Sequence, residues 1–110
     1  MTDKIVVLSS CGSPEEAERL ARVLLEAKLA ACVSVVMQKS SFYWWKDKIE
    51  VASEWLLIIK TKRELFDPVR LKLELSHSYS VPEVIALPIV DGSPSFLAWM
   101  DSELAGPPLE

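Results

Sequence analysis

The sequence predicts an α+β fold, and three observations support this prediction. Short apolar runs typical of strands alternate with segments of helical spacing in the order β-α-β-β-α-β, and a further helix follows. The length of 110 residues suits one compact domain. Four consecutive aromatic residues lie between the two central strands. This order is that of a split β-α-β, or ferredoxin-like, sandwich with a long central hairpin. We expect one domain over residues 1–105 and a disordered tail at 106–110.

The first strand and first helix have clear local signals. Residues 5–8 form an unbroken apolar run, which is typical of a strand buried on both faces. Ser13, Pro14 and Glu16 predict the start of a helix, because serine can cap it, proline suits its first position and glutamate completes a capping box. The buried stripe of this helix, which ends near residue 28, is Ala17, Leu20, Ala21, Leu24 and Leu25.

The central hairpin carries the aromatic run. Residues 32–37 begin a strand that continues into Phe42, Tyr43, Trp44 and Trp45. A polar break at 46–48 reverses the chain into a third strand at 49–61. Because side chains alternate along a strand, two large rings fall on each face of the hairpin. A single small core covers one of these faces, so we expect another copy of the chain to cover the other.

The second half of the chain completes the pattern. Thr61 and Glu64 predict a second helix that starts with another capping box. A loop at 77–82 leads to a fourth strand at 84–90, where Pro88 indicates a sheet edge or a bulge. The apolar residues of the second helix and of the last short helix are Phe66, Val69 and Leu73, and Phe96, Leu97, Trp99 and Met100.

The apolar content predicts self-association. Half of the residues (50%) are hydrophobic and the mean hydropathy is +0.21, although 25% of the residues are charged. Two helices cover one face of a four-stranded sheet and leave the other face open. Three copies that pack their sheets inward are one closed arrangement, so we expect a homotrimer, although the sequence does not count the copies.

The net charge and the absence of targeting signals limit the expected classes of binding partner and the expected cellular location. The net charge of −4 argues against nucleic acid and against an anionic membrane surface. The first residues do not form a signal peptide, and no apolar stretch approaches the roughly 20 residues needed to span a bilayer. Two cysteines are too few for a disulfide framework. We expect a cytoplasmic protein with no membrane insertion; the sequence identifies no other protein partner.

Five motifs, in order and at the right spacing, resemble a known family. They are Leu29-Ala30-Ala31-Cys32-Val33, Ser41-x-Tyr43-x-Trp45, Lys60-Thr61, His77-x-Tyr79-x-Val81-Pro82-Glu83 and the late Trp99. Over residues 5 to 101 the chain is similar to the divalent-cation tolerance protein CutA family. The resemblance implies a ferredoxin-like protomer, a homotrimer, a link to tolerance of copper and other divalent cations in bacteria, and no settled reaction. Animal relatives have been linked to acetylcholinesterase anchoring.

The chain departs from the family pattern where copper binding has been proposed. Members proposed to bind copper carry a cysteine near the end of the first strand, where this chain has Ser9 with Cys11 two residues later. They also carry two adjacent histidines, where this chain has Ser76 and His77, and Ser78 replaces a proline. These changes leave the implied fold and trimer in place, but the implied metal site does not transfer intact.

Cys11 and His77 are the candidate metal ligands. His77, the one histidine, falls at a helix end, and copper prefers nitrogen and sulfur donors. Cys11 lies at a strand-to-helix junction, where the helix N-terminus should lower the thiol pKa. The alternatives are a capping or hydrogen-bonded His77 and, for Cys32, a small core residue. Copper or another divalent cation is therefore a possible ligand.

A second candidate site is a cleft for a small ligand. Lys60, Tyr79 and Glu83 lie at the end of the third strand, in the loop and at the start of the fourth strand. We expect them to converge, with Tyr43 and Trp45 as walls at a trimer interface and Lys60 as the charge that attracts an anion. The alternative is a buried Lys–Glu pair with a tyrosine hydroxyl bonded to it.

Three functions remain open at this point. The favoured one is a non-catalytic trimer that binds a metal or a small ligand. The alternative is a signalling trimer similar to the PII proteins, although the chain has three glycines and no glycine-rich phosphate loop. An enzyme with His77 as general base beside Tyr79 or Glu83 is the third, but no nucleophile–base pair is visible. An RNA-binding module is excluded by the acidic balance.

Overall fold

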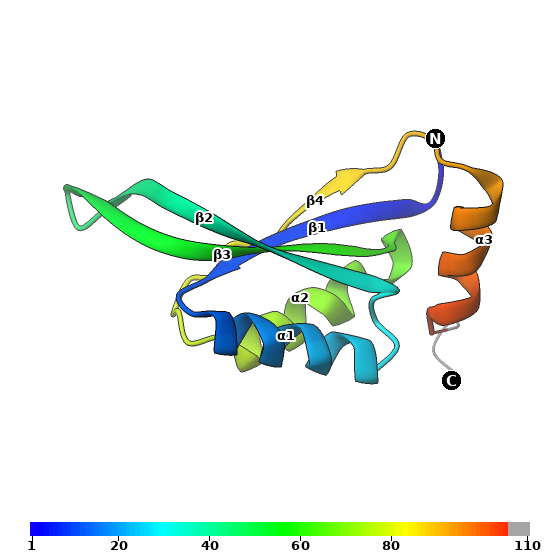
Figure 1. Ribbon diagram of the computed structural model, residues 1–110, viewed down its shortest axis with the longest axis horizontal. Coiled ribbons are helices and arrows are strands. Elements are labelled where there is room, and N and C mark those ends of the chain that lie inside the picture. The colour runs from blue at the N-terminus through cyan, green and yellow to red at the C-terminus, as the bar shows by residue number, and fades with distance from the viewer. Residues whose placement is uncertain (106–110) are drawn as a thin grey trace.

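A computed structural model describes residues 1–105 and confirms the predicted α+β order (Figure 1). The elements are β1 Lys4–Cys11, α1 Pro14–Glu26, β2 Cys32–Trp45, β3 Lys48–Lys62, a 3-10 turn Arg63–Leu65, α2 Phe66–Ser76, β4 Ile85–Pro88 and α3 Pro94–Glu103. The tail 106–110, predicted to be disordered, lies outside the described residues. Within the described part, no helix is both long and apolar enough to cross a membrane.

The four strands form one antiparallel sheet in the order β2-β3-β1-β4. Strand β4 pairs only with β1 in this sheet, so Pro88 lies on an edge strand as predicted. The strand is shorter than the expected 84–90. The predicted split β-α-β topology is therefore confirmed.

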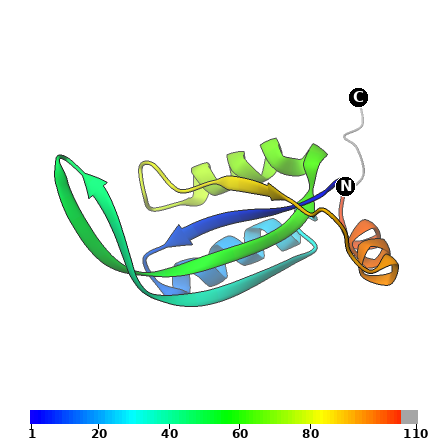
Figure 2. The same cartoon turned by 90° about the horizontal axis from the view of Figure 1, so that it is seen from above.

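Helices α1 and α2 cover one face of the sheet, and Figures 1 and 2 show both helices on the same side. The core between these layers contains inward-facing residues of β1 and β3 and the apolar stripes of the two helices. Its members are Ile5, Val7, Cys11, Ala17, Leu20, Leu24, Ala30, Leu57, Ile59, Val69 and Leu73. All of these side chains are shielded from solvent within a single chain.

The start of α1 confirms one half of the predicted capping box. The Ser13 hydroxyl accepts a hydrogen bond of 3.1 Å from the Glu16 amide, and Pro14 occupies the first helical position. The reciprocal half is wrong, because the Glu16 carboxylate accepts hydrogen bonds from Ser78 instead. A side chain that bonds a distant loop contributes to tertiary structure, which the local capping pattern does not indicate.

The capping box predicted at Thr61 is also wrong. The Thr61 hydroxyl is buried and donates to the Leu29 carbonyl oxygen at 2.7 Å, so it is not free to cap a helix. The chain passes through the 3-10 turn Arg63–Leu65 before α2 begins at Phe66. The threonine therefore ties β3 to the segment that precedes β2.

The other face of the sheet is covered only at one end, where α3 packs. Register places seven apolar residues on this open face: Val6, Leu8, Val36, Leu56, Ile58, Ile85 and Leu87. At the α3 end, the Lys4 ammonium is shielded and forms ion pairs with Asp3 and with Asp101. The rest of the open face has no covering layer within the described residues (Figure 1).

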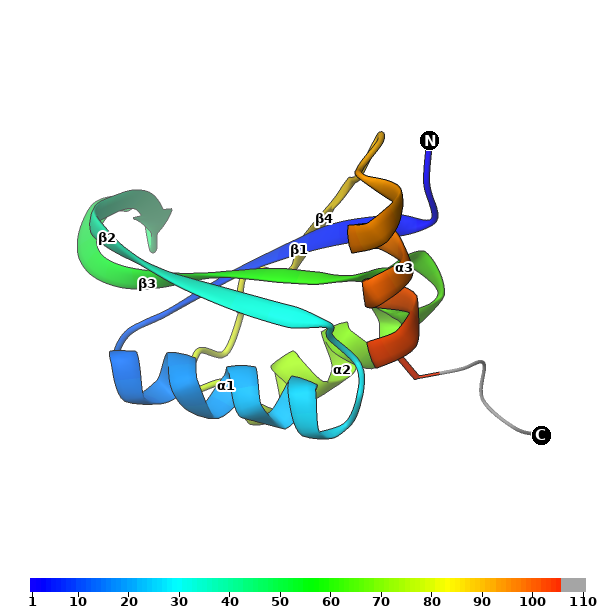
Figure 3. The same ribbon diagram turned by 45° about the vertical axis from the view of Figure 1, so that its right-hand side comes forward.

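The β2–β3 hairpin projects beyond the helices and curls, as Figure 3 shows. A register shift between Gln38 and Ser41 marks a bulge, which bends the hairpin. Lys46 and Asp47 form its turn with positive φ angles of 50° and 64°. Phe42 and Trp44 are 70% and 72% exposed, so the chain alone does not bury this face of the hairpin.

Candidate functional site

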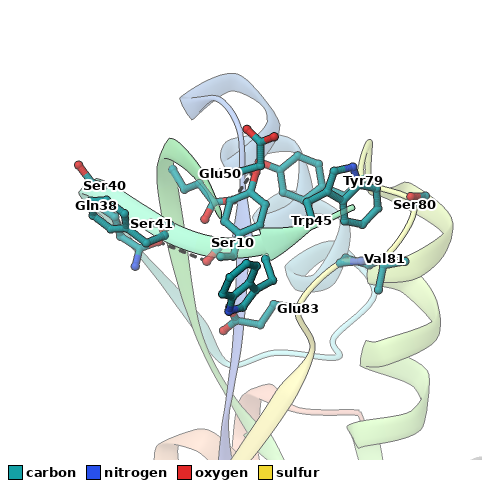
Figure 4. Close-up of a pocket in the computed structure, with 15 residues that line it drawn as sticks. Ser10, Gln38, Ser40, Ser41, Trp45, Glu50, Tyr79, Ser80, Val81 and Glu83 are labelled. Atoms are coloured by element: carbon teal, nitrogen blue, oxygen red, sulfur yellow. Dashed lines mark hydrogen bonds between the residues drawn. The ribbon is translucent and has the colours of Figure 1, made fainter. Parts of the chain in front are cut away.

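An open pocket of about 870 Å³ lies at the base of the hairpin, and we call it the hairpin pocket. Figure 4 shows its lining arriving from the end of β1, from the hairpin and from the loop before β4. The lining residues are Ser10, Gln38, Ser40, Ser41, Phe42, Tyr43, Trp44, Trp45, Glu50, Glu54, Tyr79, Ser80, Val81, Pro82 and Glu83. They combine aromatic walls with three carboxylates, and none is a lysine, an arginine or a histidine.

A hydrogen-bond network fixes the loop that forms one wall of the pocket. Glu16 at the start of α1 accepts from the Ser78 amide and from the Ser78 hydroxyl, both at 2.8 Å. His77 Nε2 contacts the Ser10 carbonyl oxygen at 2.8 Å, and His77 Nδ1 accepts from the Tyr79 amide at 3.1 Å. The loop is thus tied to α1 and to β1, and it holds Tyr79 toward the pocket.

Tyr79 links this loop to β3. Its hydroxyl donates to Glu54 Oε2 at 2.9 Å, across the pocket wall. Burial raises the pKa of Tyr79, and the hydrogen bond to the Glu54 carboxylate raises it further. The hydroxyl therefore keeps its proton and acts as a donor. A Cβ on Gly12 would lie 3.3 Å from the Tyr79 hydroxyl oxygen, so the glycine allows this close approach.

Negative charge is concentrated in the pocket. Glu54 is only 8% exposed, and it forms no ion pair within residues 1–105. Glu83 is exposed in the single chain, but partial desolvation beside the pocket wall raises its pKa, and the negative charge of Glu54 adds to this effect. Glu50 is a third carboxylate in the lining. Since a buried charge is costly unless it is compensated, the pocket favours a positively charged occupant.

The structure brings together four of the five residues that we expected in the cleft. Tyr43, Trp45, Tyr79 and Glu83 all line the hairpin pocket. Lys60 does not, because it lies six residues beyond Glu54 along β3, which is about 20 Å at ~3.3 Å per residue. Its ammonium contacts Cys32 Sγ at 3.5 Å on the open face of the sheet. The expected convergence of Lys60 with Glu83, and with it an anion pocket in the single chain, is therefore wrong.

Cys11 and His77 do not offer copper a donor set in this arrangement. Cys11 is fully buried, and its thiol lies 3.5 Å from the Ser13 carbonyl oxygen. Burial raises the pKa of this thiol, so the lowered pKa expected at the helix N-terminus is wrong. The His77 side chain is 0% exposed, and both ring nitrogens already have hydrogen-bond partners. A metal ligand needs a free lone pair, which neither ring nitrogen presents.

No group of three histidine, cysteine, aspartate or glutamate residues within residues 1–105 is arranged to hold a metal ion. Sequence reasoning missed Glu54, Ser10 and Gln38 as lining residues. Glu54 carried a usable signal, because it is a charged residue directly before the apolar run of β3. Ser10 and Gln38, whose side chains lie 3.3 Å apart, gave no such signal.

Comparison with known proteins identifies similar chains. The profile of the CutA1 divalent ion tolerance protein family matches residues 5–103. The divalent-cation tolerance protein CutA of Archaeoglobus fulgidus is 51% identical over 89 residues, which cover 81% of this chain and 86% of that protein. The chloroplastic protein CutA 1 of Oryza sativa is 44% identical over 96 residues. These residues cover 87% of this chain and 54% of that longer protein.

Solved structures agree with the sequence comparison. A structure described as the periplasmic divalent cation tolerance protein CutA from Archaeoglobus fulgidus has a TM-score of 0.89 at 44% identity, and the match covers 91% of this chain and 97% of that one. The divalent cation tolerance protein from Thermus thermophilus has a TM-score of 0.90 at 35% identity, with coverage of 93% and 99%. The fold is thus similar over most of both chains.

Proposed function

The chain belongs to the CutA1 divalent ion tolerance protein family, and from this premise we propose that it acts in divalent-cation tolerance as a non-catalytic homotrimer that binds a cationic ligand in the hairpin pocket. The observation that carries the proposal is the Glu54 carboxylate, which is shielded in an aromatic-walled pocket without a positive partner in the described chain. A cation in the pocket would supply the missing charge.

The open face of the sheet supports self-association. Seven apolar residues share this face, and the hairpin adds two rings that are at least 70% exposed. A contiguous apolar surface of this kind marks an interface in soluble proteins. Because the face is built from one sheet, several copies can bury it by packing around an axis, and a trimer is the closed arrangement that we propose.

Two single variants test the trimer, one with a new charge on the open face of the sheet and one with a new charge on the opposite, helical side. Leu87 on the open face and Leu71 on the outer surface of α2 are each 50% exposed in the single chain. We expect native mass spectrometry to show a trimer for the wild type and for Leu71→Glu, and dissociation for Leu87→Glu at equal concentration. A wild-type monomer, or trimers of unchanged stability in both variants, would contradict the proposed assembly.

Copper at Cys11 and His77 stays a prediction that the observed geometry does not favour. Titration of chelator-stripped protein with one equivalent of copper per chain under reducing conditions tests it directly. We expect the wild type to bind no stoichiometric copper that is lost in the His77→Gln variant. A stoichiometric complex lost in His77→Gln and in Cys11→Ser would restore that site and show that the loop around His77 rearranges.

The PII-like alternative receives no support from the pocket. A nucleotide would bring phosphate charge next to Glu50, Glu54 and Glu83, and none of the lining residues is basic. We expect no stabilisation by nucleotides in a thermal-shift screen. Catalysis is not part of the proposal either, since the His77 ring nitrogens are engaged and Tyr79 keeps its proton.

A cytoplasmic location stays a prediction for this chain. Among the relatives, the Archaeoglobus fulgidus structure is described as periplasmic and the Oryza sativa protein as chloroplastic. Fractionation of cells that express the chain with an epitope tag tests the location, and recovery outside the cytoplasmic fraction would contradict it.

A further inference from the structure

We propose that the ligand class of the hairpin pocket is an organic ammonium ion, with N–H donors for the carboxylates of Glu54 and Glu83 and an apolar body that lies against the aromatic walls. This inference rests on the proposed function, because it names the chemistry of the cation that the same pocket would bind. Three features of the pocket separate an organic cation from an inorganic one.

The first feature is the state of Glu54. Its Oε2 accepts the Tyr79 hydroxyl at 2.9 Å, while Oε1 has no hydrogen-bond partner in the described part of the chain. The side chain is more than nine-tenths buried and lines the pocket. Oε1 is not among the fully buried atoms without a partner in residues 1–105, so it can be reached from the pocket. An ammonium N–H at this oxygen supplies both the missing donor and the opposite charge.

The second feature is the size and lining of the pocket. A cavity of about 870 Å³ is in the range of sites for small organic molecules and far larger than a bare ion needs. Tyr43, Trp45 and Tyr79 provide ring surfaces beside the carboxylates, as Figure 4 shows for Trp45 and Tyr79. Aromatic faces attract organic cations and bury alkyl groups, whereas a strongly hydrated metal ion gains little from them.

The third feature concerns the arrangement of the acidic groups. Glu50, Glu54 and Glu83 share the pocket, yet no three acidic, cysteine or histidine side chains within residues 1–105 converge as a metal site. Metal ions such as Mg²⁺ require oxygen ligands about 2.0–2.1 Å away in a near-octahedral set. Carboxylates spread over a wide pocket are better matched by a ligand whose charges are also spread, such as a diammonium ion.

The probe for this proposal is 1,6-diaminohexane, measured by isothermal titration calorimetry on the full chain at constant ionic strength. The uncharged 1,6-hexanediol and the N–H-free tetramethylammonium ion are the matched ligands. Glu54→Gln is the test variant, because the amide oxygen can still accept from Tyr79 while the negative charge is lost. Glu26→Gln on the exposed end of α1 is the control for the loss of one negative charge elsewhere.

We expect the diamine to bind the wild type and Glu26→Gln with equal affinity and to bind Glu54→Gln about tenfold or more weakly, since one charge-assisted hydrogen bond is lost. Hexanediol should not bind, and tetramethylammonium should bind more weakly than the diamine. Equal loss in Glu26→Gln and Glu54→Gln would overturn the proposal, because it would show a general attraction to an acidic protein.

Titration with MgCl₂ and MnCl₂ separates this inference from the proposed function. A metal ion that binds the wild type, is lost in Glu54→Gln and excludes the diamine would overturn the organic ligand and leave the cation pocket standing. Absence of binding by both the diamine and the metal ions would overturn both proposals. Circular dichroism of Glu54→Gln, with a wild-type spectrum expected, ensures that a loss of binding reports the pocket.

Discussion

The two faces of the sheet carry similar apolar residues in very different surroundings. Leu57 and Ile59 on the helix-covered face of β3 are 0% exposed, whereas Val36 and Leu87 on the open face are 45% and 50% exposed. The same alternation along β3 produces both faces. Apolar patterning therefore predicts that a residue is buried, but not whether the same chain or another copy buries it.

The core between the sheet and the two helices is complete within one chain and should depend on that chain alone. Its core contacts link β1 and β3 with α1 and α2. The open face, the projecting hairpin and the hairpin pocket are not covered by the single chain, and only the proposed trimer would cover them. The difference separates the residues that determine folding from those that determine association and ligand binding.

Separate substitutions of two neighbouring leucines, one on each face of β3, test the difference between the two faces most directly. Leu57 faces the helices and Leu56 faces the open side of the sheet. We expect Leu57→Ala to lower the free energy of unfolding by about 2–5 kcal/mol at any protein concentration, because it leaves a cavity in a closed core. Leu56→Ala should have a smaller effect on the single chain and should weaken the assembly instead.

Chemical denaturation at several protein concentrations measures both effects. The loss in Leu57→Ala should not depend on concentration, while that in Leu56→Ala should grow as the protein is diluted. Equal and concentration-independent losses in both variants would show that the open face is stabilised within one chain, contrary to the comparison.

The fold was predictable because its signals are local. Pro14 and the stripe of α1 mark a helix, and the polar break before Lys48 marks the hairpin turn, where Lys46 and Asp47 adopt positive φ angles. The two capping predictions failed at Glu16 and Thr61 because both side chains bond partners far away in the sequence. A tertiary hydrogen bond overrides a local motif.

The candidate site was only partly predictable for the same reason. Tyr79 and Glu83 lie in a loop with a recognisable motif, and Tyr43 and Trp45 belong to a conspicuous aromatic run. Lys60 was misplaced because β3 and β4 both run antiparallel to β1, so the end of β3 and the start of β4 lie toward opposite ends of the sheet. The raised pKa of Cys11 reflects burial that depends on how the helices pack.

Acid denaturation tests the network that joins the helix-covered side to the hairpin pocket. Burial raises the pKa of Glu16, but the hydrogen bonds from Ser78 and the positive charge of Arg19 lower it, so the net pKa is below its usual value of 4.5. Its contribution to stability is therefore present above pH 4.5 and is lost as the pH falls through the folded-state pKa.

Glu16→Gln should lower the stability by about 1–2 kcal/mol at pH 7, since it weakens charge-assisted hydrogen bonds to Ser78, and should lose less stability than the wild type on acidification. Urea denaturation between pH 7 and pH 3 measures both slopes. Glu18→Gln is the control, because Glu18 is exposed on the same helix and, among residues 1–105, pairs only with Arg22. Identical pH profiles for the wild type and Glu16→Gln would show that the Glu16–Ser78 contacts carry no net stability.

The smallest expected difference compares the starts of the two outer helices. Ser13 caps α1 on the covered side through the Glu16 amide, whereas Ser93 at the start of α3 forms no side-chain capping bond within the part of the chain that the structure describes. We expect Ser13→Ala to cost about 1 kcal/mol and Ser93→Ala less than about 0.5 kcal/mol. Thermal unfolding monitored by circular dichroism measures both. A larger loss of stability in Ser93→Ala than in Ser13→Ala would contradict this expectation. It would show that α3 depends on contacts that the single chain does not contain, and therefore that α3 is part of the interface between copies.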